Sequence, residues 1–147
     1  MPVTDVQAAA LRAFLTQDIE SAARLTRNLS REETSGYTYL ALAALSVAAR
    51  DRFHPECTHA DMVRYVAKAR IQRIQDGEEY DFDPAAAENV LRHALGHPVT
   101  HAADPQEQFR AVIALLSALA GDAHADQAEV DMVLARARVL ADRWMAG

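Results

Sequence analysis

Signals that start α-helices recur along the whole chain and constrain its fold more than any other feature. Thr4, Ser30 and Thr58 each stand three positions before a Gln, Glu or Asp, which is the capping-box pattern, weakest at Thr58. Two further starts are the Asp-Pro pairs at 83–84 and 104–105, where the aspartate can cap and the proline needs no N–H donor. Glycines at positions 96 and 121 stand where helices can end in a left-handed residue. The chain is therefore predicted to be built from helices.

These boundaries divide the chain into six predicted helices, at about 5–28, 31–53, 59–75, 84–95, 105–120 and 126–145. No segment alternates apolar and polar residues between turn signals, so no sheet is expected. The links contain no low-complexity stretch, and 147 residues is the length of one domain. We therefore predict a single all-α domain over 1–147, folded as a compact six-helix bundle.

Two of these helices, 31–53 and 105–120, are apolar on nearly every side. Leu40, Leu42 and Leu45 point in divergent directions, and Leu115 lies off the main apolar stripe of its helix. A helix of this kind is either central in the fold or covered by a partner. We expect the two helices to touch at the centre of the molecule.

A weak internal repeat gives these two helices matching places in the chain. Residues 43–70 resemble residues 114–138 with one gap, so that Met62 aligns with Met132. If the repeat is real, it describes two related helical hairpins whose first members form the centre. Chance similarity between alanine-rich helices is the alternative.

Charge and cysteine content limit the classes of function. A net charge of −6 argues against a nucleic-acid partner, because nucleic-acid binders usually carry a basic field. The single cysteine, Cys57, cannot form an internal disulfide and favours a reducing, cytoplasmic compartment. The first ten residues contain no basic residue and no apolar block, so no secretory signal is expected. The most apolar runs, 39–49 and 111–120, are about half the roughly 20 residues that cross a bilayer, so no membrane partner is predicted.

Histidines mark the first candidate site, because all six lie in or beside the predicted links. His54, Cys57 and His59 lie close together in sequence with Asp61 beside them, and zinc takes histidine, cysteine and carboxylate ligands. We therefore take His54, Cys57 and His59 as candidate metal ligands. Their spacing matches no standard zinc pair, and histidines also suit helix ends for electrostatic reasons alone.

The acidic link at 121–129 is a second candidate. Asp122, Asp126 and Glu129 recur there between two helices, which is similar to calcium loops, although the EF-hand glycine and loop length are missing. The hairpin resembles the helical tellurite-resistance B-like domain, which places acids between paired helices. Here the glycine precedes the aspartate, so no site residue is carried over. The simpler interpretation is that Asp126 and Glu129 stabilise a helix N-terminus.

Two charges interrupt apolar stripes. Asp18 falls within the stripe of the first predicted helix, and Arg70 falls among the apolar residues of the third. Charges are rarely buried unless they are paired, so we predict that Asp18 and Arg70 either form an ion pair or line a ligand pocket or partner groove. The third helix is also basic, and its Arg64 and Lys68 share a face that is expected to be solvated. Its basic residues Arg64, Lys68, Arg70 and Arg73 are expected to be balanced by the acids just downstream.

No nucleophile elbow, phosphate-binding glycine loop, dinucleotide fingerprint or paired-cysteine zinc motif is present in the sequence. We therefore predict a non-enzymatic helical module that binds a protein or a ligand through a surface groove, without a cofactor. Self-association is expected to give at most a modest homodimer whose seam includes Leu42 or Leu115. The alternative is a small metal-dependent helical enzyme that uses the loop histidines, so the question of enzymatic activity stays open.

Overall fold

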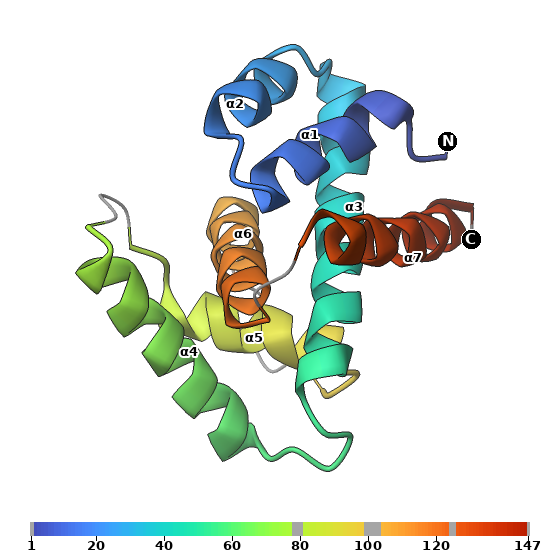
Figure 1. Cartoon of the computed structure of the whole chain (residues 1–147). Coiled ribbons are helices and arrows are strands. Elements are labelled where there is room, and N and C mark those ends of the chain that lie inside the picture. Colours follow the sequence, from blue (N-terminus) through green and yellow to red (C-terminus); the bar gives the residue numbers. More distant parts are fainter. Residues whose placement is uncertain (1, 78–80, 99–103, 124–125, 147) are drawn as a thin grey trace.

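The computed structural model describes residues 2–77, 81–98, 104–123 and 126–146, and this part of the chain is helical with no strand (Figure 1). Its seven helices are α1 (Asp5–Leu15), α2 (Ile19–Arg27), α3 (Arg31–Arg52), α4 (His59–Gln75), α5 (Pro84–Ala94), α6 (Pro105–Asp122) and α7 (Gln127–Ala146). The predicted all-α class is confirmed, whereas the count of six helices is not. None of the helices in the described ranges combines the length and the hydropathy of a membrane-spanning segment.

The extra helix arises because the predicted helix at 5–28 is broken in the middle. Gln17 adopts a left-handed backbone with φ of 64°, which an α-helix cannot contain. On one side of it, the Thr16 hydroxyl donates a hydrogen bond of 2.8 Å to the carbonyl of Arg12. On the other side, the Asp18 carboxylate accepts from the backbone N–H of Ser21 at 3.2 Å and starts α2. The chain therefore turns at Gln17, and α2 packs back against α1.

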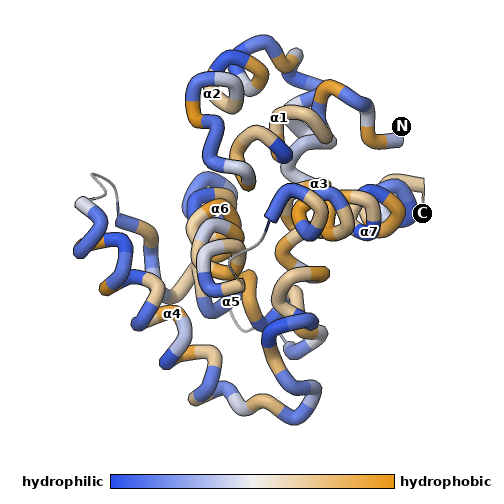
Figure 2. The backbone as a smooth tube through the Cα atoms, in the orientation of Figure 1, coloured by the Kyte–Doolittle hydropathy of each residue, from blue (hydrophilic) through white to orange (hydrophobic). Residues whose placement is uncertain are grey.

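Helices α3 and α6 form the centre, as their all-round apolarity predicts. They pack against each other, and α3 also contacts α1, α5 and α7. Leu40, Leu45, Leu115 and Leu116 are at most 2% exposed. Figure 2 shows apolar residues along α3, α6 and α7, and both α6 and α7 pack on α3. Since Leu115 is fully buried inside the molecule, its predicted role in a dimer seam is wrong, and Leu42 is half-buried.

The predicted pair of related hairpins is not confirmed. Helix α4 packs on α5 and α6, and α7 packs on α3 and α1. Neither α3 with α4 nor α6 with α7 is among the helix pairs in substantial contact, and Figure 1 shows α4 diverging from α3. The aligned methionines also differ, because Met62 is fully buried whereas Met132 is 63% exposed.

Polar contacts fix the outer helices on this centre. The Ser46 hydroxyl and the Arg50 guanidinium, both on α3, donate to the carbonyl of Ala94 at 3.0 and 3.2 Å and so hold the end of α5. Arg12 of α1 pairs with Asp131 of α7 at 2.6 Å. Apart from these contacts, the end of α1, the second half of α3, the end of α6 and the first half of α7 come close enough to line one cavity.

Candidate ligand-binding cleft

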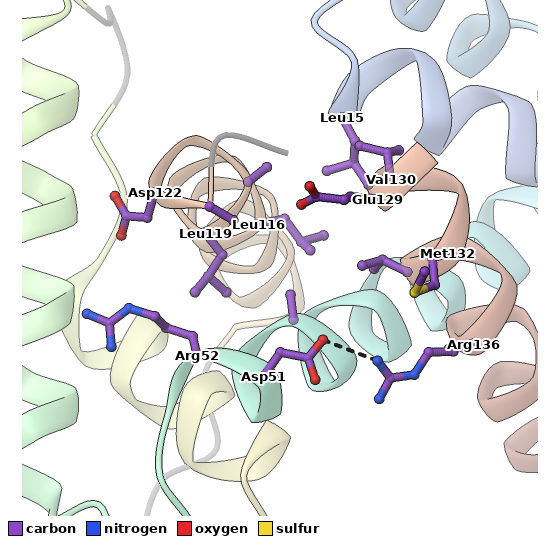
Figure 3. Close-up of a pocket in the computed structure, with 14 residues that line it drawn as sticks. Leu15, Asp51, Arg52, Leu116, Leu119, Asp122, Glu129, Val130, Met132 and Arg136 are labelled. Atoms are coloured by element: carbon purple, nitrogen blue, oxygen red, sulfur yellow. Dashed lines mark hydrogen bonds and ion pairs between the residues drawn. The ribbon is translucent and has the colours of Figure 1, made fainter. Parts of the chain in front are cut away.

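A cavity of about 360 Å³ lies where these four helices converge (Figure 3). Its apolar lining comes from Leu15 of α1, Ala48 of α3, Leu116, Leu119 and Ala120 of α6, and Val130, Met132 and Val133 of α7. We call it the α3–α6–α7 cleft. Its volume is at the lower end of the range of small-molecule sites, which are usually lined by apolar side chains with a few polar groups.

The apolar floor of the cleft follows from the packing of its helices. Leu116, Leu119 and Val130 are at most 5% exposed, so their contacts with the core fix their positions. The small side chains of Ala48 and Ala120 leave space between the helices where larger residues would fill it. The cleft therefore has a rigid apolar base.

Charged residues stand around this floor, and two of them neutralise each other. The Arg136 guanidinium of α7 pairs with the Asp51 carboxylate of α3 at 3.2 Å, with both side chains about half exposed (Figure 3). The pair joins α3 to α7 along one side of the cleft. Because each charge already has its counter-charge, neither gives the cleft a preference for a charged ligand.

Asp122 and Arg52 make their contacts toward α4. The Tyr65 hydroxyl of α4 donates a hydrogen bond of 2.9 Å to the Asp122 carboxylate. The Arg52 guanidinium lies 5.3 Å from the ring centre of Phe53 and 5.4 Å from that of Tyr65. Burial, and then the neighbouring Asp122 carboxylate, raise the pKa of Tyr65, so this phenol stays protonated as a donor.

Glu129 differs from the other charges of the cleft. It lies in the first turn of α7, and Figure 3 shows its carboxylate projecting from α7 toward α6. Within the described part of the chain, no ion pair or hydrogen bond engages this carboxylate, while its backbone N–H donates to Asp126 at 2.8 Å. The cleft thus combines an apolar floor with one carboxylate that is available at its rim.

The structure does not bring Asp18 and Arg70 together. Asp18 is exposed and caps α2, and the hydrogen bonds from Ser21 lower the pKa of its carboxyl. Arg70 is half-buried and pairs with Asp81 at 2.7 Å, one of the downstream acids. The predicted Asp18–Arg70 pair is therefore wrong, because the break at Gln17 removes Asp18 from any apolar stripe. Neither residue lines the cleft, and a role for either in ligand binding stays a prediction.

The candidate metal ligands lie in the link before α4 and at its first residue. His54 uses its Nδ1 atom to accept from the backbone N–H of Glu56 at 3.1 Å, Cys57 is half-buried, and His59 is exposed. Among the described residues, no group of three or more His, Cys, Asp and Glu side chains is placed to hold a metal ion. His101 and His124 lie outside the described residues.

Most of the cleft was not predicted from the sequence, because its walls come from four helices far apart in the chain. The acidic link at 121–129 did single out Asp122 and Glu129, although as possible calcium ligands. The other signal was the small residues, Ala48 and Ala120, within otherwise leucine-rich helices. No protein family, curated protein or solved structure matches this chain.

Proposed function

We propose that this protein is a non-enzymatic helical binding module that holds a small amphiphile in the α3–α6–α7 cleft. The ligand has an apolar body, which rests on Leu116, Leu119 and Val130, and a single protonated amine, which faces Glu129. The observation that carries the proposal is the available Glu129 carboxylate at the rim of an apolar cavity of about 360 Å³.

The chemistry of the lining supports binding and not catalysis. Among the described lining residues there is no serine, cysteine or histidine that could act as a nucleophile or as a neutral-pH base. The Asp51–Arg136 pair is internally neutralised, and Asp122 and Arg52 make their contacts toward α4. Glu129 is therefore the charge that faces a ligand in the cleft. A cytoplasmic location, which the single cysteine favours, is part of the same proposal.

The strength of binding follows from the two parts of the site. Burying an alkyl chain contributes roughly 0.8 kcal/mol per CH₂, or about 6 kcal/mol for eight carbons. Immobilising the ligand costs at least about 4 kcal/mol, so an eight-carbon chain should bind with a Kd on the order of 10 mM. Because Glu129 is exposed, its attraction for an ammonium group should add only about 0.5–1 kcal/mol. That energy corresponds to a preference of about two- to fivefold.

The test compares three ligands that share one tail. Octylammonium, 1-octanol and octanoate are titrated into ¹⁵N-labelled protein, and amide shifts of α3, α6 and α7 report binding. We expect octylammonium to bind most tightly and octanoate least. Glu129→Gln should remove the preference for octylammonium over octanol while leaving octanol affinity unchanged.

Two further variants make this experiment decisive. Glu20 is also exposed in the first turn of a helix, α2, so Glu20→Gln is the matched control and should leave the preference intact. Ala120→Leu should fill the cleft and weaken all three ligands. Equal affinities for the three ligands in the wild type would refute the cation preference. Binding that Ala120→Leu leaves unchanged would refute the cleft as the site.

A further inference from the structure

Helix α4 has two apolar faces, only one of which packs against the protein. Met62, Tyr65, Val66 and Ala69 are buried against α5 and α6. On the opposite side, Val63, Ile71 and Ile74 are 37%, 56% and 64% exposed, with the exposed Ala67 between them. These three are among the nine exposed large hydrophobic side chains of the described residues, so one helix carries a third of them. We call this stripe the outer face of α4.

The spacing of the outer face is that of a helix-packing seam. Positions 63, 67, 71 and 74 recur every three or four residues, which places them along one side of a helix. The small side chain of Ala67 near the middle lets another helix approach closely. The chain itself places no element there, because α4 contacts α5 and α6 through its other side.

The charges that flank the outer face are basic. Arg64 and Lys68 lie along one edge and Arg70 along the other. Helix α4 contains four basic residues and one acid and has a net charge of +3, in a chain whose net charge is −6. Arg64 pairs with Asp61 and Arg70 pairs with Asp81, while Lys68 has no ion-pair partner among the described residues. With Asp61 and Asp81 counted against the three basic residues, the flanks of the outer face carry a net charge of about +1, which Lys68 supplies.

We propose that the outer face of α4 docks an acidic amphipathic helix of a partner protein. An acidic residue beside the apolar seam of such a helix would pair with Lys68, and its apolar side chains would cover Val63, Ile71 and Ile74. A second copy fits less well, because pairing α4 with α4 brings rows of like charge together. A membrane surface fits less well too, because the stripe has no Trp, Phe or Leu.

The test uses two fluorescent designed peptides with the same leucine seam, one flanked by glutamate and the other by lysine. Anisotropy titrations with the 147-residue chain should show about two- to fivefold tighter binding of the glutamate peptide, weakened by added salt. Ile71→Asp should reduce this binding at least tenfold, and Lys68→Glu should reduce the preference for glutamate over lysine. Both side chains are exposed, so circular dichroism should show unchanged helicity.

The matched control is Val139→Asp on α7, because Val139 is 59% exposed and so comparable to Ile71. This variant should bind the glutamate peptide as the wild type does.

Equal binding of the two peptides, or binding unaffected by Ile71→Asp, would overturn the proposal. Wild-type dimerisation that Ile71→Asp abolishes would show that the occupant is a second copy. Binding of the protein to phosphatidylglycerol vesicles, without binding of the glutamate peptide, would show that the outer face docks on a membrane. Dimerisation or vesicle binding of this kind would also overturn the proposal of an acidic partner helix.

Discussion

Replacing Gly36 with alanine should destabilise the protein, although alanine is the better helix former. Gly36 lies within α3, where Gln7 of α1 reaches the helix. The Gln7 side chain is 4% exposed; its amide N–H donates to the carbonyl of Glu33 at 2.7 Å, and its oxygen accepts from the backbone N–H of Thr4 at 2.8 Å. A Cβ atom at position 36 would lie 2.4 Å from Gln7 Nε2 and 3.1 Å from its Cδ. The glutamine must therefore move.

The size of the effect follows from opposing contributions. Alanine in place of glycine should stabilise a helix by about 0.5–1 kcal/mol. Displacing Gln7 strains a packed site at a cost of about 1–3 kcal/mol, and loss of its hydrogen bond to Glu33 leaves polar groups unpaired at a further cost of about 1–3 kcal/mol. We expect a net destabilisation of about 2–4 kcal/mol, a large part of the stability of a domain of this size.

Urea unfolding followed by circular dichroism measures this change in the free energy of unfolding. Gly121→Ala is the matched control, because Gly121 is also helical and a Cβ there has nothing within 4 Å; it should be neutral or stabilise by up to about 1 kcal/mol. In a Gln7→Ala background, Gly36→Ala should also become neutral or stabilising. If Gly36→Ala stabilises the wild type as much as Gly121→Ala does, the contact with Gln7 costs nothing and the reasoning is wrong.

Three further predictions concern the core and the pH dependence. Leu115→Ala should lower the free energy of unfolding by about 2–5 kcal/mol in the same urea experiment, because this side chain is fully buried. Burial raises the pKa of Tyr37 to about 12, so its contribution to stability is complete below pH 10 and is lost as the pH rises through about 12. The part of the tyrosinate absorbance that comes from buried tyrosines should accordingly change together with helicity in alkali, and Tyr37→Phe should move that transition to higher pH. Arg12 lowers the pKa of Asp131, so the contribution of this pair is present above about pH 4 and is lost as the pH falls further. Asp131→Asn should therefore slightly lower the thermal midpoint at pH 7, and not at about pH 2.

The helix starts could be predicted from the sequence because a cap involves only neighbouring residues. Thr4, Ser30 and Thr58 all form the reciprocal hydrogen bonds of a capping box, and the predicted helices after Ser30 and Thr58 agree with α3 and α4 within one residue. Gly96 has the left-handed φ of 78° expected after a helix. Gly121 was predicted wrongly as a helix end, because it lies inside α6.

What the sequence did not reveal depends on contacts between distant segments or on a rare backbone conformation. A left-handed Gln17 has no sequence signature, since this region favours glycine and asparagine. Without that break, Asp18 appeared to be a buried charge when it is an N-cap. The cleft could not be predicted because helical periodicity in the sequence shows that a helix has an apolar face. It does not show which other helix packs on that face. For the same reason, residues of the packed side of α4 and residues of its exposed side were interpreted as one apolar stripe. Arg70 lies between the two sides and was therefore predicted to be buried.

Tyr65 connects the two surfaces proposed for this molecule. It lies on the packed side of α4, opposite Ile71, and its hydroxyl bonds to Asp122 at the edge of the α3–α6–α7 cleft. The ligand would bind in the cleft beside Glu129, and the partner helix would bind on the outer face of α4 at Ile71. The two proposed surfaces therefore share no described side chain. Because mutations at separate sites without shared partners usually act independently, Glu129→Gln should leave peptide binding unchanged and Ile71→Asp should leave octylammonium binding unchanged. A failure of either proposal would thus leave the other standing, whereas mutual effects of the two substitutions would show that the packing around Tyr65 couples the two surfaces.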